Sequence, residues 1–129
     1  MVIKPDALRR GLIGKIMTRF EDRGIKVVAM RMLMMTKELA ARHYAEHVEK
    51  DFYDEMVEFM MSGPILAVVF EAEDIVRIVR DMAGATDSSK AEHGTIRGDF
   101  GLSCRKNVVH TSDSVESANR EIDIFFASV

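Results

Sequence analysis

The chain has 129 residues, the length of one compact domain, and it can bury a hydrophobic core without disulfides. Apolar residues make up 47% of it and charged residues 30%, a balance that excludes disordered, collagen-like and coiled-coil chains. Because 18 Lys and Arg stand against 21 Asp and Glu, the net charge of −3 gives no general attraction to DNA, RNA or acidic lipid. We therefore expect a single domain over residues 1–129 and, if it binds anions, a local site.

Cysteine content and apolar runs indicate the compartment. The single cysteine, Cys104, cannot form an internal disulfide, and the first six residues lack the apolar segment of a secretory signal. The longest apolar run, from Pro64 to Phe70, is much shorter than the roughly 20 residues that span a membrane. These features predict a cytoplasmic protein with no membrane partner.

The first half of the chain alternates strand and helix patterns. Residues 2–3 are typical of a strand end, and apolar residues at helical spacing predict a helix from residue 12 to Gly24. The Val, Ile and Met content of residues 25–35 predicts a long, mostly buried strand. Thr36 can cap the helix that follows, and residues 52–61 predict a second, shorter helix.

The second half contains two more strands and two more helices. Residues 65–70 form a continuous apolar run of strand length, and residues 73–83 have helical periodicity. Residues 84–101 show neither helical nor strand periodicity, which predicts an irregular loop. Residues 107–110 predict a short strand, and residues 113–116 (Asp-Ser-Val-Glu) match a capping box at the start of the last helix.

Apart from the helices between residues 37 and 61, the order of elements is βαββαβ. We therefore predict an α+β, ferredoxin-like fold: a four-stranded antiparallel sheet with helices on its faces and an irregular loop before the last strand.

Groups that bind phosphate gather in and around this loop. They are Arg80, Thr86, Thr95, Arg97, Arg105, Lys106 and Asn107. Arginine binds phosphate oxygens through two parallel charge-assisted hydrogen bonds, and hydroxyl and amide donors can complete the set. The alternative is a solvated loop that carries ordinary surface charges. Neither a Walker loop nor a kinase glycine loop occurs in the sequence to bind phosphate instead.

His110 ends the last predicted strand, just before a capped helix. A neutral imidazole nitrogen is a competent nucleophile toward phosphorus. On the final helix, Glu121 shares a face with apolar residues such as Phe125, so its carboxylate either reaches water or finds a buried partner. The imidazole N–H of His110 is a candidate for that partner, although a lone histidine can also be an ordinary core residue.

Residues 43–47, His-Tyr-Ala-Glu-His, match the pattern of inverted zinc proteases, in which two imidazoles lie one helical turn apart. No third protein ligand stands out in the sequence. We therefore favour the alternative, an amphipathic helix with polar ends.

Three segments together resemble the nucleoside diphosphate kinase family. They are residues 3–6 (Ile-Lys-Pro-Asp), 94–100 (Gly-Thr-Ile-Arg-Gly-Asp-Phe) and 107–114 (Asn-Val-Val-His-Thr-Ser-Asp-Ser), and the similarity runs without gaps from about residue 2 to residue 126. The resemblance implies a ping-pong enzyme that transfers the γ-phosphoryl group of a nucleoside triphosphate, typically ATP, to a nucleoside diphosphate through a phosphohistidine.

The resemblance also implies a role for each matching residue. His110 would carry the phosphoryl group, Glu121 with Ser112 bonded to it would orient the imidazole, and Lys4 and Tyr44 would complete the catalytic set. Nucleotide phosphates, sugar and base would be bound by Lys4, Phe52, Arg80, Thr86, Arg97 and Asn107. Mg²⁺ would be the cofactor, held mainly by the substrate's phosphates and not by a protein metal site.

The implied partners are nucleoside triphosphates and diphosphates, including ATP and GTP, and further copies of the chain in a hexamer or a tetramer of dimers, with no nucleic acid. Some positions depart from the family pattern: Thr111 replaces the usual Gly or Ala, Asp51 and Ser88 replace prolines, and both ends are shorter. Crowding by Thr111 motivates an alternative, a catalytically impaired member that acts as a nucleotide-binding or interaction module. Nucleic-acid binding through the sheet is a weaker alternative, because the paired aromatic strand motif is missing.

Overall fold

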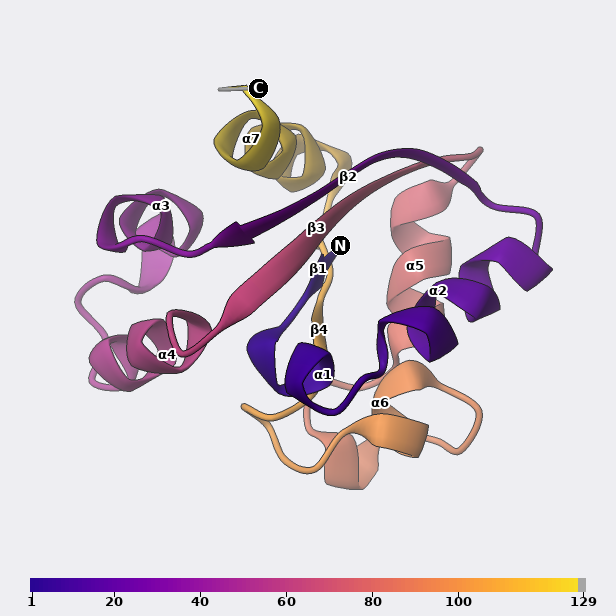
Figure 1. The fold of residues 1–129 in the computed structure, drawn as a ribbon, viewed down its shortest axis with the longest axis horizontal. Coiled ribbons are helices and arrows are strands. Elements are labelled where there is room, and N and C mark those ends of the chain that lie inside the picture. The colour runs from indigo at the N-terminus through magenta and orange to yellow at the C-terminus, as the bar shows by residue number, and fades with distance from the viewer. Residues whose placement is uncertain (128–129) are drawn as a thin grey trace.

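The computed structural model, which describes residues 1–127, contains one four-stranded antiparallel sheet (Figure 1). Its strands are β1 (Val2–Ile3), β2 (Lys26–Met34), β3 (Pro64–Glu71) and β4 (Val109–His110). They lie in the order β2-β3-β1-β4, so the two strands nearest the termini are neighbours and β2 is at an edge. This order and the helices around the sheet confirm the predicted α+β, ferredoxin-like fold.

Seven α-helices and two short 3₁₀ helices are described within residues 1–127. They are α1 (Pro5–Arg9), α2 (Ile13–Asp22), α3 (Lys37–His43), η1 (Ala45–His47), α4 (Tyr53–Met60), α5 (Ile75–Ala83), η2 (Ser88–Lys90), α6 (Ile96–Phe100) and α7 (Val115–Phe126). Figure 1 shows α2 and α5 on one side of the sheet, with α3, α4 and α7 on the other. No helix in this described part is long and apolar enough to cross a lipid bilayer.

Successive side chains of a strand point to opposite faces, so each buried strand contributes to two hydrophobic clusters. Ile3, Leu66 and Val68 pack against α2 and α5, whereas Val2 and Ala67 pack against α3, α4 and α7. Burial on both faces explains why β3 is a continuous apolar run in the sequence and not an alternating one.

The prediction that residues 25–35 form a mostly buried strand was right about the strand and wrong about its burial. Within residues 1–127, strand β2 pairs only with β3, and Met30, Met32 and Met34 are each about half exposed. The strand is apolar like a central strand, but it lies at the edge of the sheet.

Two α-helices were not predicted. Pro5 is the first residue of helix α1, and α6 lies inside the segment predicted to be irregular. Thr95 caps α6, because its hydroxyl accepts a hydrogen bond from the Gly98 N–H. Each of these helices has five residues, too few to give a visible period.

Two of the predicted caps can be compared with the structure. Thr36 caps α3 as predicted, accepting a hydrogen bond from the Leu39 N–H. The predicted capping box at α7 was displaced by one residue, since Ser114 and not Asp113 is the N-cap, and its hydroxyl accepts from the Ser117 N–H. Helix α7 therefore begins one residue later than the sequence pattern indicated.

Candidate active site

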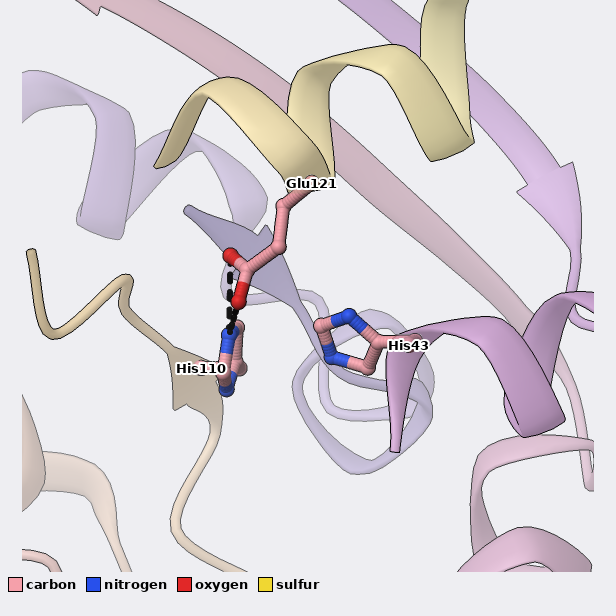
Figure 2. A group of neighbouring side chains, drawn as sticks. All are labelled: His43, His110 and Glu121. Carbon is pink, nitrogen blue, oxygen red and sulfur yellow. Dashed lines mark hydrogen bonds and ion pairs between the residues drawn. The ribbon is translucent and has the colours of Figure 1, made fainter. Parts of the chain in front are cut away.

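Strand β4 and helix α7 bring His110 and Glu121 into contact (Figure 2). The Nε2 atom of His110 lies 3.0 and 3.1 Å from the two carboxylate oxygens of Glu121. The Ser112 hydroxyl donates a hydrogen bond of 2.6 Å to the same carboxylate. Because an ionised carboxylate only accepts hydrogen bonds, this contact fixes the proton on Nε2 and leaves the lone pair on Nδ1, which points away from Glu121 (Figure 2).

The charges of this pair follow from burial and hydrogen bonding. Burial alone would raise the pKa of Glu121, but the hydrogen bond and charge of His110, together with the Ser112 hydroxyl, outweigh it and lower the pKa to about 2. Burial lowers the pKa of His110, and the hydrogen bond that its Nε2–H donates to Glu121 only partly offsets this. At neutral pH, the carboxylate is therefore charged and the imidazole is neutral.

The residue two positions before His110 has a strained backbone. Val108 has a φ of +66°, in the left-handed region that β-branched residues rarely adopt. Its N–H donates a hydrogen bond to the buried Asp6 carboxylate at 3.2 Å, and its carbonyl accepts one from the Lys4 N–H at 2.9 Å. These two bonds hold the turn that directs the chain into β4, and they give Asp6 a positioning role that its place in the 3–6 segment did not reveal.

A cleft of about 330 Å³ opens beside His110. Nine of the ten predicted site residues line it: Lys4, Tyr44, Phe52, Arg80, Thr86, Arg97, Asn107, His110 and Glu121. The tenth, Ser112, contacts the carboxylate of Glu121. Residues from six different segments of the chain thus meet at one surface.

Lys4 and Asn107 form a linked pair inside the cleft. The Lys4 Nζ donates to the Asn107 Oδ1 at 2.8 Å, and the Asn107 amide nitrogen donates to the carbonyls of Thr86 and Cys104. Burial and the nearby charge of Arg97 lower the pKa of Lys4 to about 8. Lys4 therefore remains mostly protonated at neutral pH, although little stabilises its charge.

The two arginines of the cleft differ in their surroundings. Arg97 is buried, and its guanidinium donates to the carbonyls of Gly84 at 2.9 Å and Val109 at 2.7 Å, which ties the loop to β4. Burial and the nearby Arg80 lower the pKa of Arg97 to about 10. Arg80 is exposed and makes no hydrogen bond or ion pair within residues 1–127, so its guanidinium can bind a ligand.

Two aromatic residues lie at different depths. Phe52 is 42% exposed at the mouth of the cleft, near the ring of His47 and the Lys50 ammonium. Tyr44 is buried, and burial followed by the charge of Glu121 raises the pKa of its hydroxyl. Phe52 can therefore contact a planar ligand from outside, whereas Tyr44 lines the interior.

The zinc-protease interpretation of residues 43–47 is wrong. Helix α3 ends at His43 and the chain continues as η1, so His43 and His47 are not one α-helical turn apart. The described residues do contain a group of three potential metal ligands close together, but it consists of His43, His110 and Glu121. The ring of His43 lies 4.6 Å from that of His110, a contact that no local pattern indicated.

Four further residues line the cleft that no sequence pattern singled out as site residues: Met56, Cys104, Ser117 and Arg120. Glu46 and His47, from the 43–47 segment, and Asp113, from the 107–114 segment, also line it. Two positions that depart from the family pattern are buried: Thr111 lines the cleft, and the Ser88 hydroxyl donates to the Ser103 carbonyl at 3.0 Å. Ser88 thus makes a hydrogen bond that a proline at that position could not make.

A neutral histidine whose proton is held by a carboxylate, facing a cleft lined with cations, is suited to nucleophilic attack on phosphorus. Such a site is typical of phosphotransferases. The family model described as nucleoside diphosphate kinase matches residues 1–129.

Relatives with this name are similar over almost the whole chain. Those of Methanosphaera stadtmanae and Halalkalibacterium halodurans are 50% and 52% identical, covering 97% and 99% of this chain and 82% and 87% of their own. The solved structure of a Halobacterium salinarum nucleoside diphosphate kinase in complex with CDP is 46% identical with a TM-score of 0.93, covering 97% of this chain and 84% of its own. This chain belongs to the nucleoside diphosphate kinase family.

The Glu121→Gln variant tests how the proton of His110 is held. A glutamine amide can both donate and accept, so we expect the imidazole to populate both neutral tautomers where wild type has the Nε2–H form alone. Ring ¹⁵N chemical shifts measure the two populations. Asp123→Asn removes an exposed carboxylate from the same helix as a control. A single unchanged tautomer in Glu121→Gln would show that the carboxylate does not set it.

Proposed function

We propose that this protein is an active nucleoside diphosphate kinase that transfers the γ-phosphoryl group of a nucleoside triphosphate to a nucleoside diphosphate through His110. The observation that carries the proposal is the contact of His110 Nε2 with the Glu121 carboxylate, 3.0 Å long and supported by Ser112. This contact leaves the Nδ1 lone pair to attack phosphorus. As positive charge develops on the imidazole during attack, the ionised carboxylate stabilises it.

The cations of the cleft supply the electrostatic part of catalysis. Arg80 reaches the phosphates from the rim, while Lys4 and Arg97 act from inside. Each terminal nitrogen of Arg97 has a second N–H besides the one given to a carbonyl, so the guanidinium can bind phosphate without releasing the backbone. These groups neutralise charge on the transferring phosphoryl group and hold it in line with Nδ1.

We propose Mg²⁺ as the cofactor, carried into the cleft by the nucleotide. The donor set fits this, because the carboxylate of Glu121 already accepts from His110 and Ser112, and the other acidic residues that line the cleft, Glu46 and Asp113, do not join it in a cluster of carboxylates within residues 1–127. Mg²⁺ bound through phosphates and water needs no protein cage. When bound, it adds charge neutralisation on the phosphates.

Base recognition is assigned to Phe52. Its exposed ring at the mouth of the cleft can stack on any nucleobase, and stacking does not read hydrogen-bonding edges. The donor and acceptor nucleotides would therefore use the same contacts in turn. We expect low base selectivity, so that ATP, GTP and their diphosphates are all substrates, with ping-pong kinetics.

Incubation with γ-labelled ATP and Mg²⁺ should leave an acid-labile phosphoryl group on His110. In His110→Ala, labelling and nucleotide turnover should fall by at least about a thousandfold, since the nucleophile is gone. His93→Ala, at an exposed position away from the cleft, serves as the control. Undiminished labelling of His110→Ala would falsify the assignment.

A second candidate function is nucleotide binding without efficient turnover, and the burial of Thr111 in the cleft favours it. Turnover of GTP with CDP and nucleotide affinity are measured together on wild type and Thr111→Gly. Rapid wild-type turnover excludes this candidate. Tight binding with negligible phosphate exchange, restored in Thr111→Gly, would support it.

The pKa of about 8 for Lys4 predicts a pH dependence of nucleotide binding. Above pH 8 the amine of the free protein loses its proton and must regain it to contact phosphate, so affinity should fall by up to about tenfold per pH unit. Lys4→Arg keeps its charge over this range and should abolish the fall, even if its affinity at pH 7 is lower. Binding of ADP from pH 7 to 9.5 checks this, and equal slopes for the two proteins would contradict it.

We also propose that the protein assembles from several copies through the edge strand β2, as a hexamer or a tetramer of dimers. Met30, Met32 and Met34 lie on one side of this strand, and each is about half exposed, as is Val28 at the bulge. An apolar edge strand of nine residues is a template for pairing with a second copy. The exposed thiol of Cys104 is consistent with a reducing compartment, and we propose the cytoplasm.

Light scattering tests the assembly. Met32→Glu places a charge in the proposed interface and should weaken association at least about tenfold, because burying an unpaired charge costs more than about 1.4 kcal/mol. Val115→Glu introduces the same charge at an exposed apolar residue of α7 and should leave the size unchanged. A wild-type monomer, or equal sizes for both variants, contradicts the proposed interface.

A further inference from the structure

His43 is a buried histidine at the last position of helix α3. The residue is 5% exposed, and within residues 1–127 neither of its ring nitrogens has a partner. Buried polar atoms in proteins are nearly always paired, so two unpaired nitrogens on one side chain need an explanation. Figure 2 shows the His43 ring directed from the end of α3 toward His110 and Glu121.

The three side chains have the composition and spacing of a metal site. One ligand atom from each of His43, His110 and Glu121 can be chosen so that all lie within 4.8 Å of one another. Ligands placed tetrahedrally around Zn²⁺ at its usual bond lengths are about 3.3 Å apart, so small side-chain rotations suffice. Two imidazoles and one carboxylate are a common zinc set, whereas Mg²⁺ prefers oxygen ligands.

We propose that His43, His110 and Glu121 form an inhibitory site for Zn²⁺ or a similar divalent transition-metal ion. All three residues line the cleft, so the fourth coordination position opens toward water or a phosphate oxygen. The ion takes the place of the proton that now lies between His110 Nε2 and the carboxylate of Glu121.

The site inhibits because it changes the tautomer of His110; this step rests on the proposed function. When the metal occupies the Nε2 lone pair, the imidazole proton moves from Nε2 to Nδ1, with no net proton release. The Nδ1 atom then has no lone pair for attack on phosphorus. Conversely, attack through Nδ1 leaves the phosphorylated imidazole with its Nε2 proton paired with Glu121, so zinc must displace that proton to bind and phosphorylation should weaken zinc binding.

Calorimetric titration of the nucleotide-free protein with Zn²⁺ tests the site directly. We expect one ion per chain in wild type and binding at least about tenfold weaker in His43→Phe. Loss of a residue that merely hydrogen-bonds a metal ligand already weakens metal binding about tenfold or more, and loss of a ligand itself should weaken it further. Phenylalanine suits the position because the ring packs among Tyr44, Phe125 and His110, and no hydrogen bond is lost. His93→Gln and Cys104→Ser, which remove an exposed imidazole and the thiol, should bind like wild type.

Ring ¹⁵N spectra of the wild-type protein give a second test, which does not depend on whether a variant folds. Zinc should shift the ring ¹⁵N signals of His43 and His110 and leave those of His47 and His93 in place, and excess Mg²⁺ should shift none of them. Equal affinity in His43→Phe, loss of binding in Cys104→Ser, or shifts confined to His47 or His93 would each overturn the site.

Labelling of His110 by ATP, measured with and without zinc, tests the inhibition separately. Zinc should reduce labelling of wild type and of His93→Gln by the same ratio, with little reduction in His43→Phe. Zinc binding together with unreduced labelling of wild type overturns the inhibition. If no protein is labelled even without zinc, the proposed function fails, while the titration still decides whether the metal site exists.

Discussion

The hydrogen bond between His110 and Glu121 is the interaction on which the rest of the site depends. It joins the last strand to the last helix, fixes the imidazole tautomer and keeps the carboxylate ionised in a buried place. Neither residue would have these properties alone, because burial would favour the neutral acid. The Ser112 hydroxyl donates a further hydrogen bond to the same carboxylate. Thus one contact between β4 and α7 gives a histidine beside the cleft a fixed orientation and a free Nδ1 lone pair, which the proposed reaction requires.

The cations of the cleft are arranged before any ligand arrives. Lys4 is half-buried and Arg97 is buried, and desolvation together with the nearby positive charges lowers the pKa of each. The hydrogen bond between Asp6 and the strained Val108 fixes the backbone to which both cations are attached, since the Lys4 N–H donates to the Val108 carbonyl and the Arg97 guanidinium to the Val109 carbonyl. In the proposed function, a phosphate entering the cleft would relieve the repulsion, so part of the energy needed to gather positive charge is spent in folding and not during reaction. This is how a chain of net charge −3 can bind a polyanion at one place.

Local patterns predicted most of the fold, and they failed where local information is insufficient. The periodicity of residues 12–24 and 73–83 identified two helices, and the apolar run at 65–70 identified β3. Helices α1 and α6 are too short to show a period. The burial of β2 was wrongly predicted because an apolar strand has the same composition at the edge of a sheet as in its centre, and only strand order distinguishes the two.

The sequence by itself determined which chemical groups were available: a histidine after a strand, an acid on an apolar helix face and cations around a loop, in segments that resemble one family. These are properties of neighbouring residues, and spacing reveals them. Only the tertiary structure decided that His43, more than sixty residues from His110, lies against its ring, and that Asp6 supports Val108. Such contacts depend on how β1 and β4 pair and how α3 packs against α7, and no local pattern encodes them.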